Sequence, residues 1–381
     1  MKRKKLVIIS HTEHYADADG IVKGWGSTVN EINFLADSWE TIYHVGCLYS
    51  ADAPASSLAY TKDNIHFVPI PPYGGKRLWD KFLILVKLPK IIFQVVRTVR
   101  GASEVQLRLP TSMGLFLLPL FSFFIPRTFT FWLKYAGNWA QVDPPIGYAI
   151  QRWWLQKNIA RCPVTINGFW RDQPTHCLSF ENPCLTNEDI EEGKLIGSDK
   201  TFTGPFEFVF VGRLEKEKGV DRIIEALSQI EISQIKKMHF IGDGISKEKY
   251  KRETKFLGDK VQFYGFLNSG DVHQLLKRAH FVLLPSTASE GFPKVIAEAA
   301  CYGVIPIVSN VGSIGHYIDN TNGFVWDVTS DISYNEVLLN TVNSNASLLK
   351  EMSGVVLELA EKFTFTNYIS KLKLSVLQSI R

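Results

Sequence analysis

Two glutamates eight positions apart give the strongest chemical signal in the sequence. They enclose the segment Glu290-Gly-Phe-Pro-Lys-Val-Ile-Ala-Glu298, which follows an apolar run at 281–285 and a loop of small residues. Pro293 suits the first turn of a helix, and Gly291 lets the backbone approach a ligand closely. The free N–H groups of such a turn attract anions. A lone pair of glutamates would be ordinary solvated acids, but this whole string predicts that Glu290 and Glu298 accept hydrogen bonds from one extended ligand.

A second motif starts in another apolar run, Val209-Phe-Val-Gly212-Arg213, and continues to Lys218. Arg213 and Lys218 fall in a turn between a strand and a helix, at the sheet edge where open α/β sheets bind ligands. A guanidinium and an ammonium that converge there suit a diphosphate. A third turn, Gly242-Asp243-Gly244, ends the next strand in the same plane, although this triplet is also ordinary turn chemistry.

Apolar runs that alternate with helical stretches predict an α/β protein with two doubly wound parallel sheets. Strands are expected at 5–9, 41–45, 65–69, 104–108, 128–134 and 164–167, and then at 206–211, 238–241, 261–266, 281–284 and 304–308. Helices are expected at 26–39, 88–99, 112–124, 221–229, 247–256, 271–279 and 293–302. Polar sequence with Pro and Gly between 182 and 205 interrupts the alternation and predicts the domain boundary.

In their order and spacing, these motifs resemble the nucleotide-sugar half of retaining GT-B glycosyltransferases of family 4, the glycosyl transferases group 1. The resemblance is sharp over residues 206–327. Glu290 and Glu298 match the family's E-x7-E motif, and Arg213 and Lys218 match its phosphate-binding pair. The resemblance implies two Rossmann-like domains that face a cleft. The acceptor-side domain would span 1–185 and the donor-binding domain 186–363, and a C-terminal helix at 364–381 would cross back to the first domain.

Roles for individual residues also follow from the resemblance. Arg213, Lys218 and Glu290 are expected in catalysis. The donor-binding residues that it implies are Gly26, Gly212, Asp243, Gly244, Gly291, Phe292, Pro293, Lys294 and Glu298. Gly24-Trp25-Gly26 resembles the family's glycine loop after the first strand, although Trp25 separates two glycines that are usually adjacent.

The first domain departs from the family pattern at one place. Many members carry a histidine near the sugar where this sequence reads Lys134-Tyr135-Ala-Gly-Asn138. The sugar contact passes to Lys134, Tyr135 or Asn138, or it is absent. Trp25 and His11, which ends the first strand, complete the acceptor-side candidates, and a surface or core position is the alternative for His11.

No cofactor and no metal ion are expected. Asp17-Ala-Asp19 matches the Asp-x-Asp motif that binds a divalent metal in the other main glycosyltransferase fold, but that fold carries it after a later strand. Arg213, Lys218 and a helix start would already neutralise a diphosphate, so we expect Asp17 and Asp19 to form a polar loop. The five dispersed cysteines indicate neither a structural metal nor a disulfide framework.

Positive charge is concentrated in the first half of the chain. Residues 1–185 carry 20 Lys and Arg against 13 Asp and Glu, a net +7, whereas the remainder has a net charge of −3. This excess is too small for a nucleic-acid binder. Part of it lies in one segment that also contains apolar residues: Lys87, Lys90, Arg97, Arg100, Trp79, Phe82 and Leu83. Such a segment suits either a solvated helix face or contact with an anionic membrane surface.

Two apolar stretches bear on location. The run at 113–125 is too short to span a bilayer, and the run at 6–9 is too short for the core of a signal peptide. We therefore expect a cytoplasmic protein, either free or peripheral on the inner face of the membrane.

The function implied by the resemblance is metal-independent, retaining glycosyl transfer of the hexosyltransferase type. A nucleotide-diphosphate sugar would be the donor, and a saccharide or lipid-linked saccharide in surface polysaccharide or glycolipid assembly the acceptor. Two alternatives stay open: a nucleotide-sugar 2-epimerase on the same fold, and a binding subunit without turnover. Intact Glu290, Glu298, Arg213 and Lys218 argue against the second.

Overall fold

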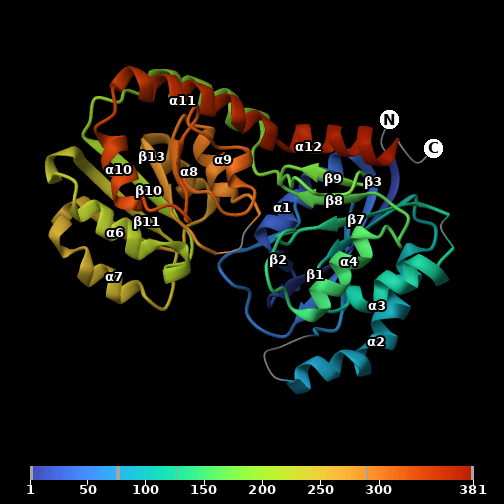
Figure 1. The fold of residues 1–381 in the computed structure, drawn as a ribbon. Coiled ribbons are helices and arrows are strands. Elements are labelled where there is room, and N and C mark those ends of the chain that lie inside the picture. The colour runs from blue at the N-terminus through green and yellow to red at the C-terminus, as the bar shows by residue number, and fades with distance from the viewer. Residues whose placement is uncertain (1–2, 74–77, 127, 289–290, 379–381) are drawn as a thin grey trace. The chain divides into compact units, whose positions relative to one another are not determined.

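Two α/β units make up the chain, each built on its own mainly parallel sheet (Figure 1). The computed structural model describes residues 3–73, 78–126, 128–288 and 291–378. The first unit comprises Met1–Phe180 together with Ile369–Arg381, and the second comprises Glu181–Tyr368. The two Rossmann-like domains expected from the sequence are confirmed.

Seven parallel strands form the body of the first sheet. They are β1 (Arg3–Ala16), β3 (Trp39–Tyr49), β5 (Ile65–Ile70), β6 (Glu104–Leu109), β7 (Thr130–Tyr135), β8 (Val164–Asn167) and β9 (Cys177–Phe180). Their order is β5-β3-β1-β6-β7-β8-β9, which changes direction beside β1 as a doubly wound sheet does. Parallel strands covered on both faces read as continuous apolar runs, and residues 6–9 of β1 are fully buried.

Two short antiparallel strands, β2 (Val22–Trp25) and β4 (Ser57–Ala59), extend this sheet beside the end of β1. The sequence did not indicate them, because three or four residues are too few to establish a periodicity. Because its last residues pair with β2, β1 continues to Ala16, past the expected end at residue 9. The chain enters the first helix from a hairpin strand.

Four helices and the C-terminal segment pack on the first sheet. They are α1 (Gly26–Leu35), α2 (Leu78–Val99), α3 (Gly114–Pro119) and α4 (Ile146–Gln156), with α12 (Phe365–Leu372) at the C-terminal end. Apolar residues of α2, α3 and α4 share one core with β1 and β6, and these three helices lie close together in Figure 1. The division between the units falls within α12, after Tyr368. Lys373 beyond it donates a hydrogen bond to Ser38 of the first unit at 3.1 Å.

The second unit has a six-stranded parallel sheet in the order β12-β11-β10-β13-β14-β15. The strands are β10 (Phe206–Val211), β11 (Ile235–Ile241), β12 (Val261–Gly265), β13 (Phe281–Leu284), β14 (Ile305–Ser309) and β15 (Phe324–Trp326). The helices are α5 (Asn187–Asp199), α6 (Val220–Ser228), α7 (Lys247–Glu253), α8 (Ser269–Arg278), α9 (Lys294–Ala300), α10 (Tyr334–Val342) and α11 (Ala346–Ala360). Contacts group α6 with α7 and α10, and α9 with α5, α8 and α11, as two helical layers (Figure 1).

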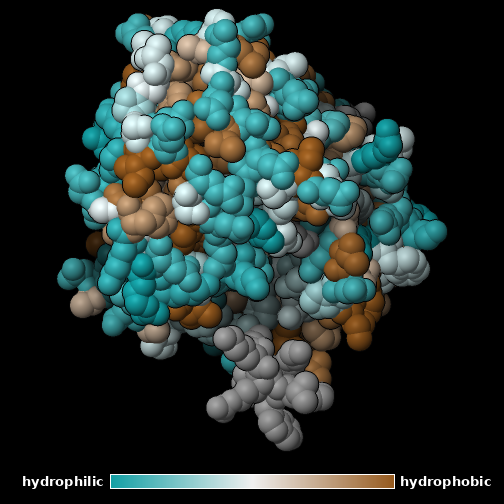
Figure 2. Space-filling view, turned by 60° about the vertical axis from the view of Figure 1, so that its left-hand side comes forward, coloured by the Kyte–Doolittle hydropathy of each residue, from teal (hydrophilic) through white to brown (hydrophobic). Residues whose placement is uncertain are grey.

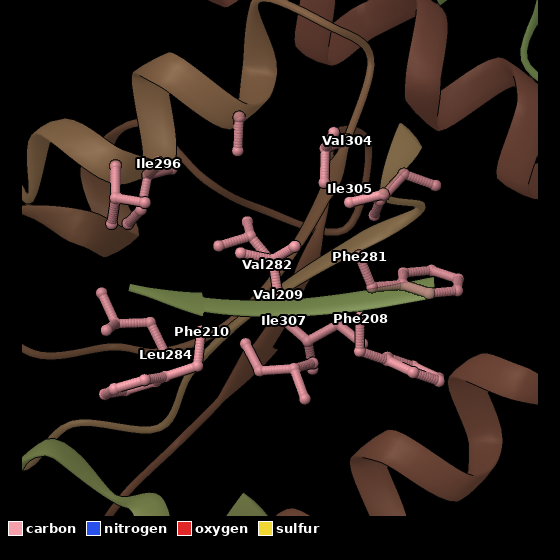
Figure 3. Close-up of a cluster of buried hydrophobic side chains, with 14 of the residues drawn as sticks. Phe208, Val209, Phe210, Phe281, Val282, Leu284, Ile296, Val304, Ile305 and Ile307 are labelled. Atoms are coloured by element: carbon pink, nitrogen blue, oxygen red, sulfur yellow. The ribbon is translucent and has the colours of Figure 1, made fainter. Parts of the chain in front are cut away.

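Side chains that alternate along β10 fill the core of the second unit. Figure 3 shows Phe208 and Phe210 of β10 on one side of this strand. Val282 of β13 and Ile296 of α9 lie on the other side, and all four side chains are fully buried. Burying a Phe or Ile side chain contributes roughly 1.5–3 kcal/mol each, so the sheet rests on a strong apolar core. Hydrophilic side chains predominate on the face drawn in Figure 2, where hydrophobic ones are exposed in small groups.

Within the described residues, no helix combines the length and the apolar character needed to cross a membrane.

Some boundaries differ from expectation for local reasons. α1 ends at Leu35 and not at residue 39, because Trp39 is buried as the first residue of β3. The side chain of Asn64 holds this turn by donating hydrogen bonds to the carbonyls of Ala36 and Trp39, each at 2.9 Å. α2 begins ten residues earlier than expected and contains Pro89 in its interior.

The polar segment before residue 205 was expected to connect the domains, and it contains a helix. Thr186 caps α5 by accepting a hydrogen bond from the backbone N–H of Asp189, and the Asp189 carboxylate accepts one from the backbone N–H of Thr186. This capping box satisfies two backbone donors at the helix start. Capping therefore supports a helix whose apolar periodicity is weak.

A buried carboxylate joins α1 to two strands of the first sheet. Glu31 on α1 pairs with Lys134 on β7 at 2.7 Å and with Arg108 on β6 at 3.0 Å. All three side chains are less than 10% exposed. Two cations thus share one carboxylate in a buried site. A charge without a partner in such a site would strongly destabilise the fold.

The substitution Glu31→Gln should destabilise the first unit by about 3–5 kcal/mol, because it leaves two buried cations without their carboxylate. Tryptophan fluorescence during urea unfolding reports mainly on this unit, since eight of the nine tryptophans precede residue 181. Asp37→Asn, which breaks an exposed pair with Lys62, is the control and should change stability by about 0–1 kcal/mol. Equal effects of the two substitutions would show that the buried cluster does not stabilise the fold.

Candidate functional site

Three loops of the second unit meet at the carboxyl edge of its sheet. They follow β10, β11 and β13, which are neighbours in the sheet. The backbone N–H of Leu214 donates to the carbonyl of Asp243 at 3.0 Å, and that of Thr287 donates to the carbonyl of Glu217 at 2.9 Å. The sheet order and these bonds bring together the three motifs that the sequence analysis selected.

Glycines allow the three loops to approach this closely. Gly219 has a φ of +81°, and a Cβ atom there would overlap the carbonyl of Pro285 at the end of β13. A Cβ atom on Gly244 would lie 2.5 Å from the carbonyl oxygen of Leu214. Glycine is required at both positions because the neighbouring backbone leaves no room for a Cβ atom, whether or not a ligand also approaches.

The turn after β10 presents the two predicted cations. The Arg213 side chain is 70% exposed, and its guanidinium lies 3.2 Å from a carboxylate oxygen of Glu215. Lys218 is half-buried at the end of the 3-10 turn Lys216–Lys218, which Gly219 terminates. Gly212, at the start of this turn, donates its backbone N–H to the carbonyl of Ile241 at 2.9 Å.

The Gly-Asp-Gly turn after β11 is held by its own carboxylate. Asp243 accepts hydrogen bonds from the backbone N–H of Gly244 at 2.8 Å and from the ammonium of Lys247 at 3.1 Å. The hydrogen bond from Gly244 has the larger effect, and both bonds lower the pKa of the exposed Asp243 carboxyl group. Asp243 is therefore ionised and held toward the helix that follows it.

Part of the Glu290 segment is described. Glu290 itself lies outside the described residues. Pro293 precedes α9 in an extended conformation, and the helix begins at Lys294, one residue later than expected. Phe292 is buried with its ring stacked on Phe363 at 4.6 Å and edge-on to Tyr317, so its side chain anchors the loop in the core. Two other residues expected to bind the donor, Gly291 and Lys294, are partly exposed.

Glu298 lies on α9 and is half-buried. Burial raises the pKa of its carboxyl group, while the nearby charges of His273 and Lys294 act in the opposite direction. An acid that is disfavoured as an anion in the free protein gains from hydroxyl donors supplied by a ligand.

Three serines near these loops were not selected from the sequence. Ser286 donates to the carbonyl of Glu217 at 3.2 Å, and Ser309 donates to the carbonyl of Ser286 at 2.5 Å. Ser313 is 2% exposed, and within the described residues its hydroxyl has no hydrogen-bond partner. The backbone N–H of Ser313 donates to the carbonyl of Gly291 at 3.4 Å. The available signal was their position at or just beyond the ends of apolar strands, where α/β sheets bind ligands.

In the first unit, His11 and Trp25 are exposed, whereas Lys134 and Tyr135 are buried. The ammonium of Lys134 is engaged by Glu31, and the ring of Tyr135 packs edge-on against Trp139 at 5.0 Å. The side-chain oxygen of Asn138 accepts a hydrogen bond from the backbone N–H of Ala140. Lys134 and Tyr135 are thus committed to the fold, and His11 and Trp25 are the candidates that the structure presents to solvent.

Gly26 and the Asp-x-Asp sequence both have local roles. A Cβ atom on Gly26 would lie 2.6 Å from the carbonyl oxygen of Ser56, to which the Gly26 N–H donates at 3.0 Å. Asp17 accepts a hydrogen bond from the backbone N–H of Ile21 at 2.8 Å and pairs with Lys23 at 3.1 Å, which closes the hairpin between β1 and β2. Among the described residues, no group of three His, Cys, Asp or Glu is arranged to hold a metal ion.

A sequence model of the family described as "Glycosyl transferases group 1" matches residues 194–353. This segment is a group 1 glycosyl transferase domain. It includes all three loops and both glutamates of the E-x7-E motif, so the family resemblance stated from those residues is confirmed.

Curated relatives match this glycosyl transferase domain over part of their length. An uncharacterized glycosyltransferase of Methanocaldococcus jannaschii is 28% identical over 168 residues, which are 42% of this chain and 45% of that protein. A candidate teichuronic acid biosynthesis glycosyltransferase of Bacillus subtilis is 33% identical over 106 residues, which are 28% of this chain and 25% of that protein. The chain thus spans less than half the length of each of these relatives.

Solved structures are similar over nearly the whole chain. Sucrose-phosphate synthase from Thermosynechococcus elongatus has a TM-score of 0.67 at 15% identity, covering 99% of both chains. HepE of Anabaena, in complex with UDP, has a TM-score of 0.63 at 17% identity, covering 99% of this chain and 100% of that one. A lipopolysaccharide outer core galactosyltransferase has a TM-score of 0.66 at 16% identity, with 98% and 99% covered. This likeness establishes the GT-B fold.

The contact at Gly219 in the glycosyl transferase domain can be tested with Gly219→Ala. A Cβ atom there forces the β10 loop away from Pro285 and adds the strain of a left-handed non-glycine residue, about 1–3 kcal/mol. We expect lower stability and at least a tenfold weaker affinity, measured by calorimetry, for whichever of UDP, GDP and ADP the wild-type protein binds best. Gly354→Ala is the matched control, since Gly354 lies exposed on α11 with open space around its Cβ position and should gain about 0.5–1 kcal/mol. Unchanged nucleotide affinity in Gly219→Ala would contradict the role of this contact.

Proposed function

We propose that this protein transfers a sugar from a nucleotide-diphosphate sugar to a hydroxyl of an acceptor saccharide, with retention at the anomeric carbon and without a metal ion. The observation that carries the proposal is the position of Arg213 and Lys218 in a turn bonded to the two neighbouring loops. The glycosyl transferase domain and the likeness to HepE, solved with UDP, support a nucleoside-diphosphate donor.

Charge on the leaving group determines what these residues do. As the bond from the anomeric carbon to the phosphate oxygen breaks, negative charge grows on the departing diphosphate. Arg213 and Lys218 would stabilise that charge as it develops, which lowers the barrier and makes a metal ion unnecessary. Glu290 would accept hydrogen bonds from the donor sugar, and Glu298 from the ribose hydroxyls.

Incubation of the purified protein with UDP-, GDP- and ADP-sugars, with and without a lipid-linked saccharide, tests the proposal. Product that requires both donor and acceptor would support glycosyl transfer. Conversion of the donor alone would indicate a 2-epimerase, and binding without turnover a non-catalytic subunit.

Arg213→Ala and Lys218→Ala should each lower kcat by on the order of 10²–10³, because each removes a positioned charge that acts mainly in the transition state. Steady-state kinetics with saturating acceptor measure the effect. A rise in the donor KM at unchanged kcat would contradict a catalytic role for these side chains.

Lys216→Ala is the matched control for both substitutions. Lys216 is exposed in the same 3-10 turn, so its loss changes the net charge equally but should alter kcat by less than about threefold.

Activity of the wild-type protein should also persist in EDTA. Loss of activity in the chelator and recovery with Mg²⁺ or Mn²⁺ would contradict the metal-independent part of the proposal.

Glu298→Gln should raise stability but weaken nucleotide binding. Burial raises the pKa of Glu298, so the folded protein holds its proton more tightly than the unfolded chain, and stability falls as the pH rises through that pKa. Glutamine has no such ionisation, so the melting temperature at pH 7 should increase. Affinity for the free nucleoside diphosphate should fall in Glu298→Gln, whereas Glu290→Gln should weaken mainly the sugar-bearing donor. Equal losses of diphosphate affinity in both variants would contradict this division of roles.

A lipid-linked acceptor is supported by the exposed side of α2. We call this the α2 surface; its residues are Leu85, Val86, Lys90, Phe93 and Arg97 on the helix and Arg100 directly after it, all exposed. The face opposite is buried, as at Ile91 and Val95. Lys87, also expected in the basic stripe, donates to the carbonyl of Pro72 at 2.6 Å, and the side chains of Trp79, Phe82 and Leu83 lie outside the described ones. Apolar and basic side chains on one exposed helix face suit the surface of an anionic bilayer.

Two similar proteins are named for cell-surface polymers, teichuronic acid and the lipopolysaccharide outer core. We extend the proposal to an acceptor of this kind, a saccharide attached to a lipid. Each basic residue near an anionic surface contributes about 1 kcal/mol, so Lys90, Arg97 and Arg100 together favour reversible, salt-sensitive binding.

Co-sedimentation with vesicles measures this binding. The wild-type protein should bind phosphatidylglycerol vesicles at low salt and phosphatidylcholine vesicles far less, and Lys90→Glu with Arg97→Glu should abolish the binding. Arg252→Glu with Lys255→Glu, at exposed positions of the second unit, changes the net charge equally and should leave it intact. Absence of binding at low salt, together with full activity on a water-soluble sugar, would contradict membrane association.

A further inference from the structure

The first unit exposes a group of large apolar side chains on α4, just before it, and on the turn that follows α3. Ile146, Ile150 and Trp153 stand at positions i, i+4 and i+7 of α4 and therefore share one face of the helix. The opposite face is buried at Gln151 and Leu155. We call the exposed group the α4 surface. Its members are between 46% and 82% exposed, and they are Phe123, Phe124, Val142, Ile146, Ile150 and Trp153.

Ring contacts join the two parts of the α4 surface. Phe123 lies in the turn Leu120–Phe124, and its ring is edge-on to that of Trp154 with 5.8 Å between the centroids. Trp154 follows Ile150 by four residues, so it lies beside the exposed face of α4. Its indole N–H donates to the hydroxyl of Ser122 at 3.3 Å. α3 and α4 contact each other and lie close together in Figure 1. Groups of exposed apolar side chains of this kind mark interaction sites.

The sequence around the α4 surface carries far more positive than negative charge. Residues 105–171 contain seven Lys and Arg and a single acid, Asp143. Two of the seven are buried with Glu31, whereas Lys157 and Arg161 are exposed just beyond the end of α4. A second copy packed on the same face would bring these like charges together. An apolar face with a basic border instead matches the surface of an anionic bilayer.

We propose that the α4 surface docks the protein on an anionic lipid bilayer. Phe124, Ile146 and Trp153 would enter the boundary between headgroups and acyl chains, where apolar side chains gain from leaving water. Lys157 and Arg161 would reach the lipid phosphates. This contact is mainly hydrophobic, unlike the salt-sensitive one proposed for the α2 surface, and it does not depend on glycosyl transfer. α2 and α4 belong to the same unit, and two weak contacts with one bilayer multiply in affinity.

Co-sedimentation with phosphatidylglycerol vesicles at low salt, without donor or acceptor, measures the contact. Phe124→Ser with Ile146→Ser removes two well exposed members of the α4 surface and leaves the charge unchanged. We expect the vesicle affinity to fall at least tenfold, because two apolar side chains no longer leave water. The slope of log affinity against log salt should stay as in the wild type. Absence of binding by the wild type, or unchanged affinity in this variant, would overturn the proposal.

Leu195→Ser with Ile232→Ser is the matched control. Both residues are apolar and exposed, but they belong to the second unit, so the vesicle affinity should change less than about twofold. The melting temperature should stay near that of the wild type in both double variants, because all four side chains are exposed. An equal loss of affinity in the control would overturn the assignment to the α4 surface.

A polarity-sensitive dye attached at Phe124→Cys reports insertion directly. None of the five native cysteines is exposed, so a thiol dye reacts selectively at an introduced surface cysteine. Its emission should shift to shorter wavelength on phosphatidylglycerol vesicles, whereas the same dye at Leu195→Cys should not shift. Equal emission at Phe124→Cys with and without vesicles would overturn insertion.

Sedimentation velocity without lipid distinguishes a bilayer from a second copy of the chain. A dimer that dissociates in Phe124→Ser with Ile146→Ser would assign the surface to a second copy and overturn the proposal, and the bilayer assignment predicts the same oligomeric state in both proteins. Turnover of donor without vesicle binding would overturn the docking surface and leave glycosyl transfer standing. Vesicle binding that depends on the α4 surface, in a protein that turns over no donor, would support the docking surface and contradict the reaction.

Discussion

Backbone contact between neighbouring loops is the constraint on which the proposed donor site depends. The backbone N–H of Leu214 bonds to Asp243, and that of Thr287 bonds to Glu217, so hydrogen bonds tie the turn after β10 to the turns after β11 and β13. Side chains at Gly219 or Gly244 would separate them. Arg213 and Lys218 therefore extend from a turn whose backbone is bonded to both neighbouring loops, and positioned charges stabilise a developing charge with little reorganisation.

The first unit is organised around a different constraint, the charge on Glu31. This carboxylate pairs with cations from β6 and β7 and so sets the position of α1 on the sheet. The pairing explains why Lys134 is a structural residue, although it stands where the family resemblance implied a sugar contact. Arg108 and Lys134 are buried with their partner and are not available to an anionic ligand.

Several groups near the two sheet edges are poorly satisfied in the free protein. Glu298 is disfavoured as an anion by burial, and the buried hydroxyls of Ser313 and Tyr73 have no hydrogen-bond partner within the described residues. Each such group lowers the stability of the folded state. A ligand rich in hydroxyls would supply hydrogen bonds to such groups.

The sequence by itself determined the elements that rest on local pattern. Short apolar runs closed by turn residues predicted β10 and β13 at their observed bounds, and motif spacing identified the glycosyl transferase domain, because buried parallel strands and strand-end turns leave a mark within a few residues. Tertiary structure alone decided the pairing of β2 with β4 and the burial of Lys134 against Glu31. These features depend on pairs of residues far apart in the chain. Their energies come from desolvation and from contacts across the sheet, and neither is encoded in the residues next to them.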